Sequence, residues 1–467
     1  MEPEQGTSAS SYYVGPIMRG VDYSPTWPGW AALSGTQTGD SDFANDAFGS
    51  LWNTEYVAPP QGDPSSPVEN ANYRGDLTTI SGIGFNLVRL YDWHMARGTT
   101  ATSNTGLDHI NFLNAAASLG LKVVVPVADN FLGEQYAWNG ATPDSAYSFG
   151  SAPASIQQDF IQLVSSIIDP ATGNIHAAVH SISVGNEGDI GQDIGGTTAA
   201  NFLARTLWWI VNLNQQINGP GTGPDGNPVV NSASPVIMLS ATFSDADQGG
   251  SAKGWFYCLV NGVDSGQATP NGCALGATFS DAVTGLAAAD AAYTSYYYNS
   301  VNVTQVDVAN NSNNLQATLQ QYDSGDTTWP GGPMGVPLLF MEVFAPNRGS
   351  SPAPYDQATA AVNQVTTIEA YIQANDGGQP SSTTWLMGYN YFELNDEPAP
   401  GNYVGLYGYG SGDQPQAQTG TTSLFYSSFP TIPFPVSAFV DNPGPNGKGT
   451  LATAISACWP SAADLRP

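Results

Sequence analysis

The sequence predicts an α/β protein, a (β/α)8 TIM barrel with long βα loops and a C-terminal extension. Three observations favour this fold. Eight short apolar runs end in turn residues, segments with helical periodicity lie between several of them, and 467 residues suffice for one barrel of about 250 residues with insertions.

Eight runs of the strand type follow one another along the chain, at 17–25, 85–93, 122–130, 182–187, 236–243, 296–303, 338–344 and 384–392. Several are nearly continuous in apolar residues, such as "KVVVPV" in the third run and "LLFM" in the seventh. Continuous apolar strands are typical of parallel sheets, in which both faces are buried. The runs therefore predict eight parallel strands.

Apolar residues at helical spacing separate the strands: Phe160, Leu163, Val164 and Ile167 before the fourth, Leu203, Leu207 and Ile210 after it, and Val362, Val365, Ile368 and Ile372 before the eighth. A doubly wound open sheet is the alternative. No G-x-G-x-x-G or Walker-type loop follows any candidate strand, so the barrel is favoured.

The chain divides into a predicted catalytic barrel at 1–430 and a Pro/Gly-rich tail at 431–467 that packs on the barrel. The tail has too many prolines for a helix or a central strand. Segments rich in Gly, Pro, Ser, Asp and aromatic residues lie at 40–73, 133–155, 244–280 and 393–425. The last three directly follow strands, where a barrel places its active-site loops.

Acidic residues greatly outnumber basic ones, with 39 Asp and Glu against 10 Lys and Arg and a net charge of −29. Such a surface repels phosphate backbones and anionic lipids, so neither a nucleic acid nor a membrane is an expected partner. No apolar stretch reaches the roughly 20 residues that span a bilayer. A neutral substrate fits this composition best.

Metal and cofactor sites are not expected. Cys258, Cys273 and Cys458 form no C-x-x-C motif, and His176 and His180 lack a third ligand and precede the fourth strand, on the wrong side of a barrel. A disulfide between Cys258 and Cys273 and two free thiols remain equally open.

The start of the chain, "MEPEQGTSASSYY", has no basic region followed by an apolar one. Either the chain is cytosolic or a signal has been removed. Few lysines and abundant Gly, Pro, Asn, Ser and Thr favour a secreted or periplasmic protein. The oligomeric state stays open.

Carboxylates gather at the predicted strand ends, at Asp22, Asp92, Asp129, Glu187, Glu342, Glu393, Asp396 and Glu397. Glu342 stands inside the apolar run "LLFMEVF", where burial costs several kcal/mol unless the charge is paired or functional. A structural ion pair with Arg89 is one explanation. Glu187 follows Asn186 at the end of the fourth strand and could be a simple surface residue.

Together the two glutamates suggest glycoside chemistry. The fourth and seventh strands of an eight-stranded barrel face each other, so Glu187 and Glu342 can converge on one glycosidic bond, about 5 Å apart in a retaining enzyme. One carboxylate attacks the anomeric carbon and the other protonates the leaving oxygen. Asn186 would hold a sugar hydroxyl, and Arg89 would keep Glu342 charged.

Five stretches, "GVDYSP", "VRLYD", "VGNE", "MEVFAP" and "YFELNDEP", resemble in order the motifs of clan A glycoside hydrolases. The closest resemblance is to family 17, the β-1,3-glucanases, and to their relatives the β-1,3-glucanosyltransferases. It implies that Glu187 is the acid/base and Glu342 the nucleophile, and it matches Asp396 and Glu397 to the segment after the last strand. Ala345 and Thr304 stand where the family has aromatic residues, so two of its stacking platforms are absent.

Further substrate contacts are expected near the strand ends. Tyr23, Tyr91, Tyr297, Trp385 and Tyr391 could stack on sugar rings, although about half of such aromatics normally pack in the rim. Asp92, Asn130 and Glu397 could bind sugar hydroxyls.

The sequence thus predicts a retaining glycoside hydrolase that acts on a β-glucan oligo- or polysaccharide. A transglycosylase is the first alternative, because either water or a second sugar could resolve the intermediate. A non-catalytic carbohydrate-binding barrel and an enzyme for another polymer, such as a mannan or a galactan, are the others.

Overall fold

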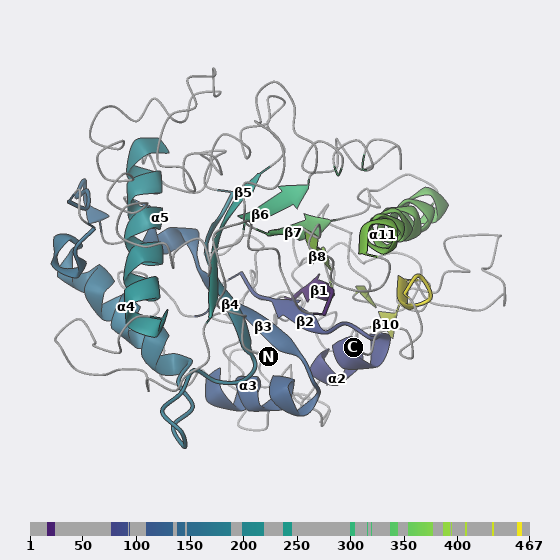
Figure 1. Ribbon diagram of the computed structural model, residues 1–467, viewed down its shortest axis with the longest axis horizontal. Coiled ribbons are helices and arrows are strands. Elements are labelled where there is room, and N and C mark those ends of the chain that lie inside the picture. The colour runs from purple at the N-terminus through teal and green to yellow at the C-terminus, as the bar shows by residue number, and fades with distance from the viewer. Residues whose placement is uncertain are drawn as a thin grey trace, which may run out of the picture.

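The computed structural model describes only part of the chain, namely residues 16–23, 76–91, 93, 109–133, 138–144, 147–187, 199–218, 237–244, 299–303, 315, 319, 337–343, 354–376, 386–392, 394, 407–408, 432–433 and 455–459. These residues contain a closed barrel of eight strands (Figure 1). The strands are β1 (Met18–Asp22), β2 (Leu87–Arg89), β3 (Lys122–Val127), β4 (Val179–Asn186), β5 (Met238–Ser244), β6 (Asn299–Val303), β7 (Leu338–Val343) and β8 (Leu386–Tyr391).

Each strand pairs in parallel with its neighbour in chain order, and β8 closes the barrel on β1. Each of the eight predicted runs contains one of these strands or overlaps it, so the barrel prediction is confirmed. The open sheet is excluded by the β1–β8 pairing. Because all strands are parallel, their C-terminal ends meet at one mouth of the barrel.

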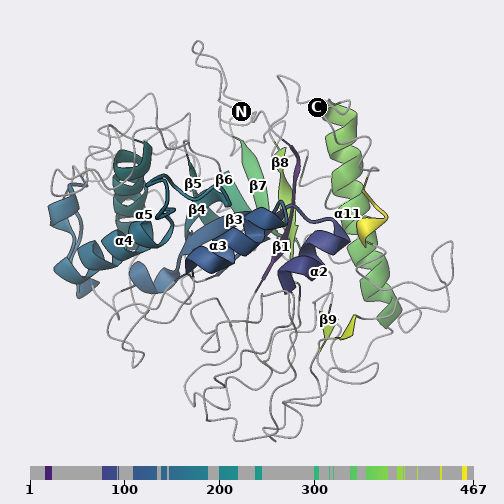
Figure 2. The ribbon, with the colours of Figure 1, turned by 90° about the horizontal axis from the view of Figure 1, so that it is seen from below.

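Helices lie outside the barrel and cover its strands (Figures 1 and 2). Those that the structure describes are α2 (Asp76–Ile83), α3 (His109–Ser118), α4 (Ala154–Ser166), α5 (Ala199–Leu213) and α11 (Pro354–Asp376). The last three contain the predicted periodic apolar residues, except Ile167, which directly follows the end of α4. None of the described helices has the length and apolarity of a membrane span.

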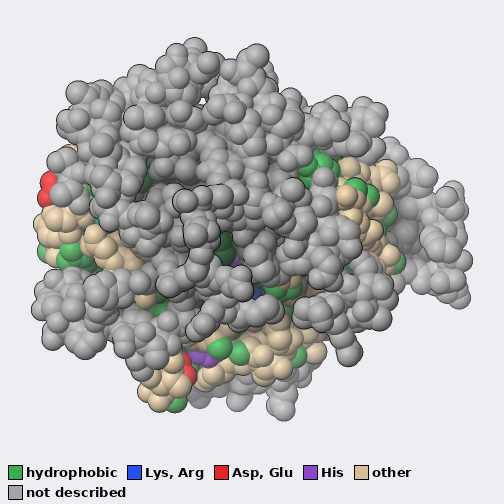
Figure 3. Space-filling model, in the orientation of Figure 1, with side chains coloured by type: hydrophobic (Ala, Val, Ile, Leu, Met, Phe, Trp, Pro, Cys, Tyr) green, Lys and Arg blue, Asp and Glu red, His purple; other side chains and the backbone are tan. Residues whose placement is uncertain are grey.

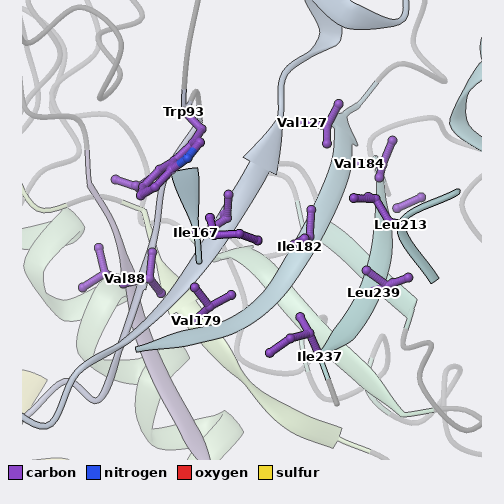
Figure 4. Packing of buried hydrophobic residues seen from close by; sticks show 14 of the residues in the cluster. Val88, Trp93, Val127, Ile167, Val179, Ile182, Val184, Leu213, Ile237 and Leu239 are labelled. Carbon is purple, nitrogen blue, oxygen red and sulfur yellow. The ribbon is translucent and has the colours of Figure 1, made fainter. Parts of the chain in front are cut away.

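The core has two parts, because side chains alternate between the two faces of each strand. Residues such as Val127, Ile182 and Leu239 point outward and pack with the helices, in the layer that Figure 4 shows around Ile167 and Leu213. The other cluster contains strand residues alone and fills the barrel interior. Its members are Met18, Leu87, Val124, Leu339, Met341 and Met387.

Two strands, β4 and β7, lose regular register near the barrel mouth. β4 has an extra residue between Val184 and Asn186 relative to β5, and β7 has an extra residue between Phe340 and Val343 relative to both β6 and β8. Such bulges re-aim side chains at the rims of barrels. The mouth is therefore where strand alternation stops predicting which way a side chain faces.

Part of the C-terminal tail packs against the opposite end of the barrel. The Ser456 hydroxyl donates to the carbonyl of Ile83 at 2.7 Å, and the Trp459 ring meets Phe85 at a centroid distance of 5.0 Å. Ile455 is fully buried. A short antiparallel pair, β9 (Tyr407–Gly408) with β10 (Ile432–Pro433), joins the segment after β8 to the tail.

Figure 3 shows one face of the molecule. On the described part of this face, hydrophobic and uncharged side chains predominate and few charged ones are visible. Only 10% of all residues in the chain are charged, which accounts for this appearance.

Candidate active site

A buried arginine connects three other strands at the barrel mouth. Arg89 ends β2, and its Nη1 donates to Glu342 Oε1 of β7 at 2.6 Å and to Asp22 Oδ1 of β1 at 3.3 Å. Its Nη2 donates to Asn186 Oδ1 of β4 at 2.6 Å. Residues up to 253 positions apart in sequence thus meet on one guanidinium.

Arg89 is held in its charged form by the acids around it. Burial by itself would lower the pKa of Arg89, but the neighbouring Tyr91, Asp22 and Glu342 raise that pKa above its ordinary value. The group therefore acts as a fixed positive charge. A buried charge is tolerated when it is paired and hydrogen-bonded, as this one is.

Tyr91 supplies a second donor to Glu342. Its hydroxyl donates to Glu342 Oε1 at 2.7 Å, and the Arg89 guanidinium lies 4.2 Å from the centre of its ring. Burial raises the pKa of Tyr91 well above its ordinary value, so the phenol keeps its proton and remains a donor. Phe392 holds the other edge of the ring, with centroids 6.1 Å apart.

Glu342 itself is only 6% exposed. Within the described residues, both donors bind the same atom, Oε1. Hydrogen bonds and a positive charge stabilise the ionised form of a carboxylate. The geometry suits an anionic carboxylate whose second oxygen, Oε2, can face a ligand.

The end of β4 is bent so that Asn186 and Glu187 reach the mouth. Gly185 has a φ of +73°, and a Cβ there would lie 3.0 Å from Leu132 Cδ1 and 3.1 Å from Asp129 Oδ1, so any other residue would be strained. Asp129 accepts the Asn186 backbone N–H at 2.8 Å. Glu187 has a φ of +55°, and its N–H donates to the carbonyl of Thr242 at 3.2 Å.

The left-handed backbone of Glu187 is costly for a residue with a side chain, on the order of 1 kcal/mol or more, and persists where surrounding contacts impose it. Here the bonds from Asp129 and Thr242 impose it on the turn after β4. Glu187 is half-buried and directly follows Asn186, which shares Arg89 with Glu342. The structure therefore brings Glu187, Asn186, Arg89, Tyr91 and Glu342 to one mouth.

Two predicted sugar contacts lie elsewhere. Tyr23 and Tyr391 are 0% and 1% exposed and belong to the layer between strands and helices. The Tyr23 hydroxyl donates to Asp76 Oδ2 of α2 at 2.9 Å. This burial corrects the expectation of stacking for both residues, because a ring without exposed surface offers no face to a sugar, and both rings pack in the core layer instead.

Other expectations fall outside the described residues. These are Asp92, Tyr297, Trp385 and Glu397, as well as Cys258 and Cys273. Asn130 lies in the short 3-10 helix η2 (Asp129–Phe131), but its side chain is not among those described.

Asp22 and Asp129 belong to the site geometry although the sequence only marked them as acids at strand ends. Strand parity would have singled out Asp22, because Val21 and Tyr23 on either side of it face outward. Nothing in the sequence indicates that Asp129 receives the Asn186 N–H, since that contact depends on the bulge in β4.

The described residues contain no group of three or more His, Cys, Asp or Glu side chains arranged to hold a metal ion. One ring nitrogen of His176 hydrogen-bonds with Asn114 Oδ1 at 3.0 Å, and the other accepts the Ala178 N–H at 3.1 Å. His180 contacts Ser181 Oγ at 3.1 Å. Both histidines are thus accounted for by structural hydrogen bonds.

No protein-family model matches the chain, and no curated protein matches it in sequence. Among solved structures, the barrel is similar to a family 1 β-glucosidase from Thermotoga maritima, with 10% identity, a TM-score of 0.47, and coverage of 89% of this chain and 97% of that one. It is also similar to Saccharomyces cerevisiae Gas2p in complex with laminaritetraose and laminaripentaose, with 11% identity, a TM-score of 0.39, and coverage of 89% and 65%. At these identities and scores, neither establishes the family or the substrate of this chain.

Proposed function

We propose that this protein is a retaining glycoside hydrolase that acts on a β-glucan, with Glu342 as nucleophile and Glu187 as acid/base. One observation carries the proposal: a carboxylate inside the apolar strand β7 receives hydrogen bonds from Arg89 and Tyr91, and the same arginine binds the residue next to Glu187. A merely structural ion pair explains neither the second donor nor the strained turn that carries Glu187.

The proposed reaction has two steps. Glu342 Oε2 attacks the anomeric carbon while Glu187 gives its proton to the leaving glycosidic oxygen, so that a glycosyl ester forms and the glycosidic C–O bond breaks. A water then attacks the same carbon, passes a proton to Glu187 and releases Glu342. Arg89 and Tyr91 orient the attacking carboxylate through Oε1, and Asn186 binds a hydroxyl beside the reacting carbon in this proposal.

The experiment compares Glu187→Gln and Glu342→Gln with the wild type on two substrates. On a β-glucan, each variant should lose about 10²-fold or more in turnover, the scale of general acid–base and nucleophilic catalysis. On an aryl β-glucoside with a good leaving group, glycosylation needs no proton, so Glu187→Gln should still form the glycosyl-enzyme. Glu342→Gln should not.

Asp169→Asn serves as a control, because Asp169 is partly exposed and lies between α4 and β4, away from the mouth, and among the described residues its carboxylate accepts hydrogen bonds from its own turn, at Ala171 N and Thr172 Oγ1. It should keep wild-type turnover. Near-normal activity of either glutamine variant on the polymer would reject the assignment. Products longer than the substrate would instead identify a transglycosylase, and sugar binding without any bond cleavage would identify a carbohydrate-binding barrel.

A further inference from the structure

Asp22 is a buried carboxyl group that the proposed reaction does not use. It ends β1 with no exposed surface, and its Oδ1 lies 3.3 Å from the same Arg89 Nη1 that binds Glu342 at 2.6 Å. Its other oxygen, Oδ2, has no hydrogen-bond partner among the described protein atoms. A buried oxygen without a partner is costly, and far more so when it carries charge.

One positive charge therefore faces two carboxyl groups. Among the described residues, the charged or titratable groups that act on Asp22 are Arg89 of β2, Tyr91 two positions after it, and Glu342 of β7, while Asn390 on the adjoining β8 is a neutral amide. Two carboxylates on one buried guanidinium nitrogen would leave an uncompensated negative charge. In such pairs one group keeps its proton.

The contacts indicate which group that is. Glu342 accepts two short hydrogen bonds on Oε1, from Arg89 and Tyr91, and retains some exposed surface. Asp22 accepts one long bond and is sealed from solvent. The negative charge is better stabilised on Glu342.

We propose that Asp22 and Glu342 share a single negative charge opposite Arg89, with the proton on Asp22 in the resting protein. Asp22 is then a positioning residue, because it leaves the whole charge of Arg89 to the attacking carboxylate. This role rests on the proposed function of Glu342, but the sharing of one charge does not.

The sharing also balances the charge during turnover. When Glu342 becomes a neutral ester, the Asp22 carboxyl releases its proton to water, and the Asp22 carboxylate becomes the counterion of Arg89. When water resolves the ester and Glu342 regains its charge, Asp22 takes up a proton again. Arg89 thus faces one anion in both states.

The charge distribution supports this assignment. Burial, and then the charge of Glu342, raise the pKa of Asp22 well above its ordinary value of 3.8, although Arg89 acts in the opposite direction. The folded protein thus binds a proton that the unfolded chain releases in the window above 3.8. Stability must fall as pH rises through that window, and Asp22 makes no such contribution below it.

The first experiment measures thermal unfolding of the wild type and of Asp22→Asn as a function of pH. Asparagine mimics the protonated carboxyl, so the variant should melt above the wild type at neutral pH, and the difference should vanish toward pH 3.8. Glu369→Gln is the matched control, because Glu369 is a buried partner of Arg19 with bonds of 2.7 and 2.8 Å. It should melt below the wild type at neutral pH. An Asp22→Asn variant that also melts below the wild type would overturn the proposal.

The second experiment needs no stability difference and no substrate. Infrared spectra of protein labelled with [4-13C]aspartate should show a protonated aspartic acid at neutral pH that Asp22→Asn lacks. In Glu342→Gln, where the neutral amide imitates the ester, Asp22 should ionise and the same band should disappear. If Asp22→Asn does not fold, the comparison of the wild-type spectrum with that of Glu342→Gln still tests whether the two carboxyl groups share one charge.

A band that persists in Glu342→Gln, or a wild type without one, would disprove the shared charge. Neither spectrum depends on turnover. The proposed glycosidase function and the proposed sharing of one charge can therefore be disproved independently of each other.

Discussion

At the scale of single residues, Arg89 explains how an acid can stand inside an apolar strand. Taking Glu342 out of water is costly, and the cost is offset only if its charge is paired and its oxygens are hydrogen-bonded. Arg89 and Tyr91 both bind Oε1, at 2.6 and 2.7 Å. The same contacts that make burial of Glu342 tolerable also fix the direction of its free oxygen.

Tyr91→Phe should test this orientation. The phenylalanine keeps the ring that packs on Arg89 and Phe392 but removes the hydroxyl donor to Glu342. A hydrogen bond to a charged group contributes about 1.5–3 kcal/mol. Part of this interaction is lost anyway as Glu342 transfers its charge to the substrate, so kcat/KM should fall by about 10-fold.

Tyr389→Phe is the matched control for this prediction. The Tyr389 hydroxyl also donates to a buried glutamate, Glu369 Oε1, at 2.9 Å, but on the side of the barrel that packs against α11. Its removal should lower the melting temperature and leave kcat/KM unchanged. Equal kcat/KM values for Tyr91→Phe and the wild type would show that the Tyr91 hydroxyl does not act on Glu342.

At the scale of elements, a chain of side chains links the C-terminal tail to β8, α11 and β1. Trp459 Nε1 donates to the Tyr389 hydroxyl at 2.8 Å, Tyr389 donates to Glu369, and Glu369 receives both bonds from Arg19. Gly84 allows the close approach, since a Cβ there would lie 2.8 Å from the Trp459 ring. The tail thus holds the strand ends opposite the mouth.

Replacement of Trp459 should separate its hydrogen bond from its packing. Trp459→Phe removes one partly buried donor and should lower the free energy of unfolding by about 1 kcal/mol. Trp459→Ala also removes the contact with Phe85 and should cost about 2–3 kcal/mol. Denaturant unfolding with a constant m-value measures both. Turnover per folded molecule should not change, and a large loss of turnover in Trp459→Phe would contradict a purely structural tail.

Sequence patterns predicted the elements better than they predicted the faces of those elements. All eight strands were expected, yet β4 begins at Val179, three residues before the expected start at Ile182, because His180 and Ser181 break the apolar run. Ser181 is fully buried in the barrel interior, where small polar side chains are tolerated. Hydrophobicity alone cannot mark the start of such a strand.

The sequence does not predict which way the side chains of β7 face. Met341 belongs to the interior cluster, and its neighbour Glu342 also reaches Arg89 across the mouth. Two consecutive residues cannot both face inward in a regular strand, and the register shift between Phe340 and Val343 resolves the conflict. Tyr23 and Tyr391 show the converse, since regular alternation turns both outward into the core.

At the scale of the whole molecule, charge is distributed very unevenly. The whole chain carries a net charge of −29. At the barrel mouth, in contrast, the positive charge of Arg89 lies buried between Asp22 and Glu342. Repulsion between surface carboxylates destabilises a compact state, and dissolved salt screens exposed charges far more than buried ones. Salt should therefore weaken the repulsion between surface carboxylates much more than it weakens the buried ion pairs of Arg89.

The melting temperature should rise with NaCl concentration at neutral pH, because the screening length falls from about 30 Å at 0.01 M to about 3 Å at 1 M ionic strength. The same series near the isoelectric point of 4.1 is the control, since little net charge remains there to screen. Ion-specific effects of NaCl would appear equally at both pH values, whereas relief of repulsion appears only at neutral pH. Equal slopes at the two pH values would show that repulsion among the surface acids does not limit the stability of this barrel.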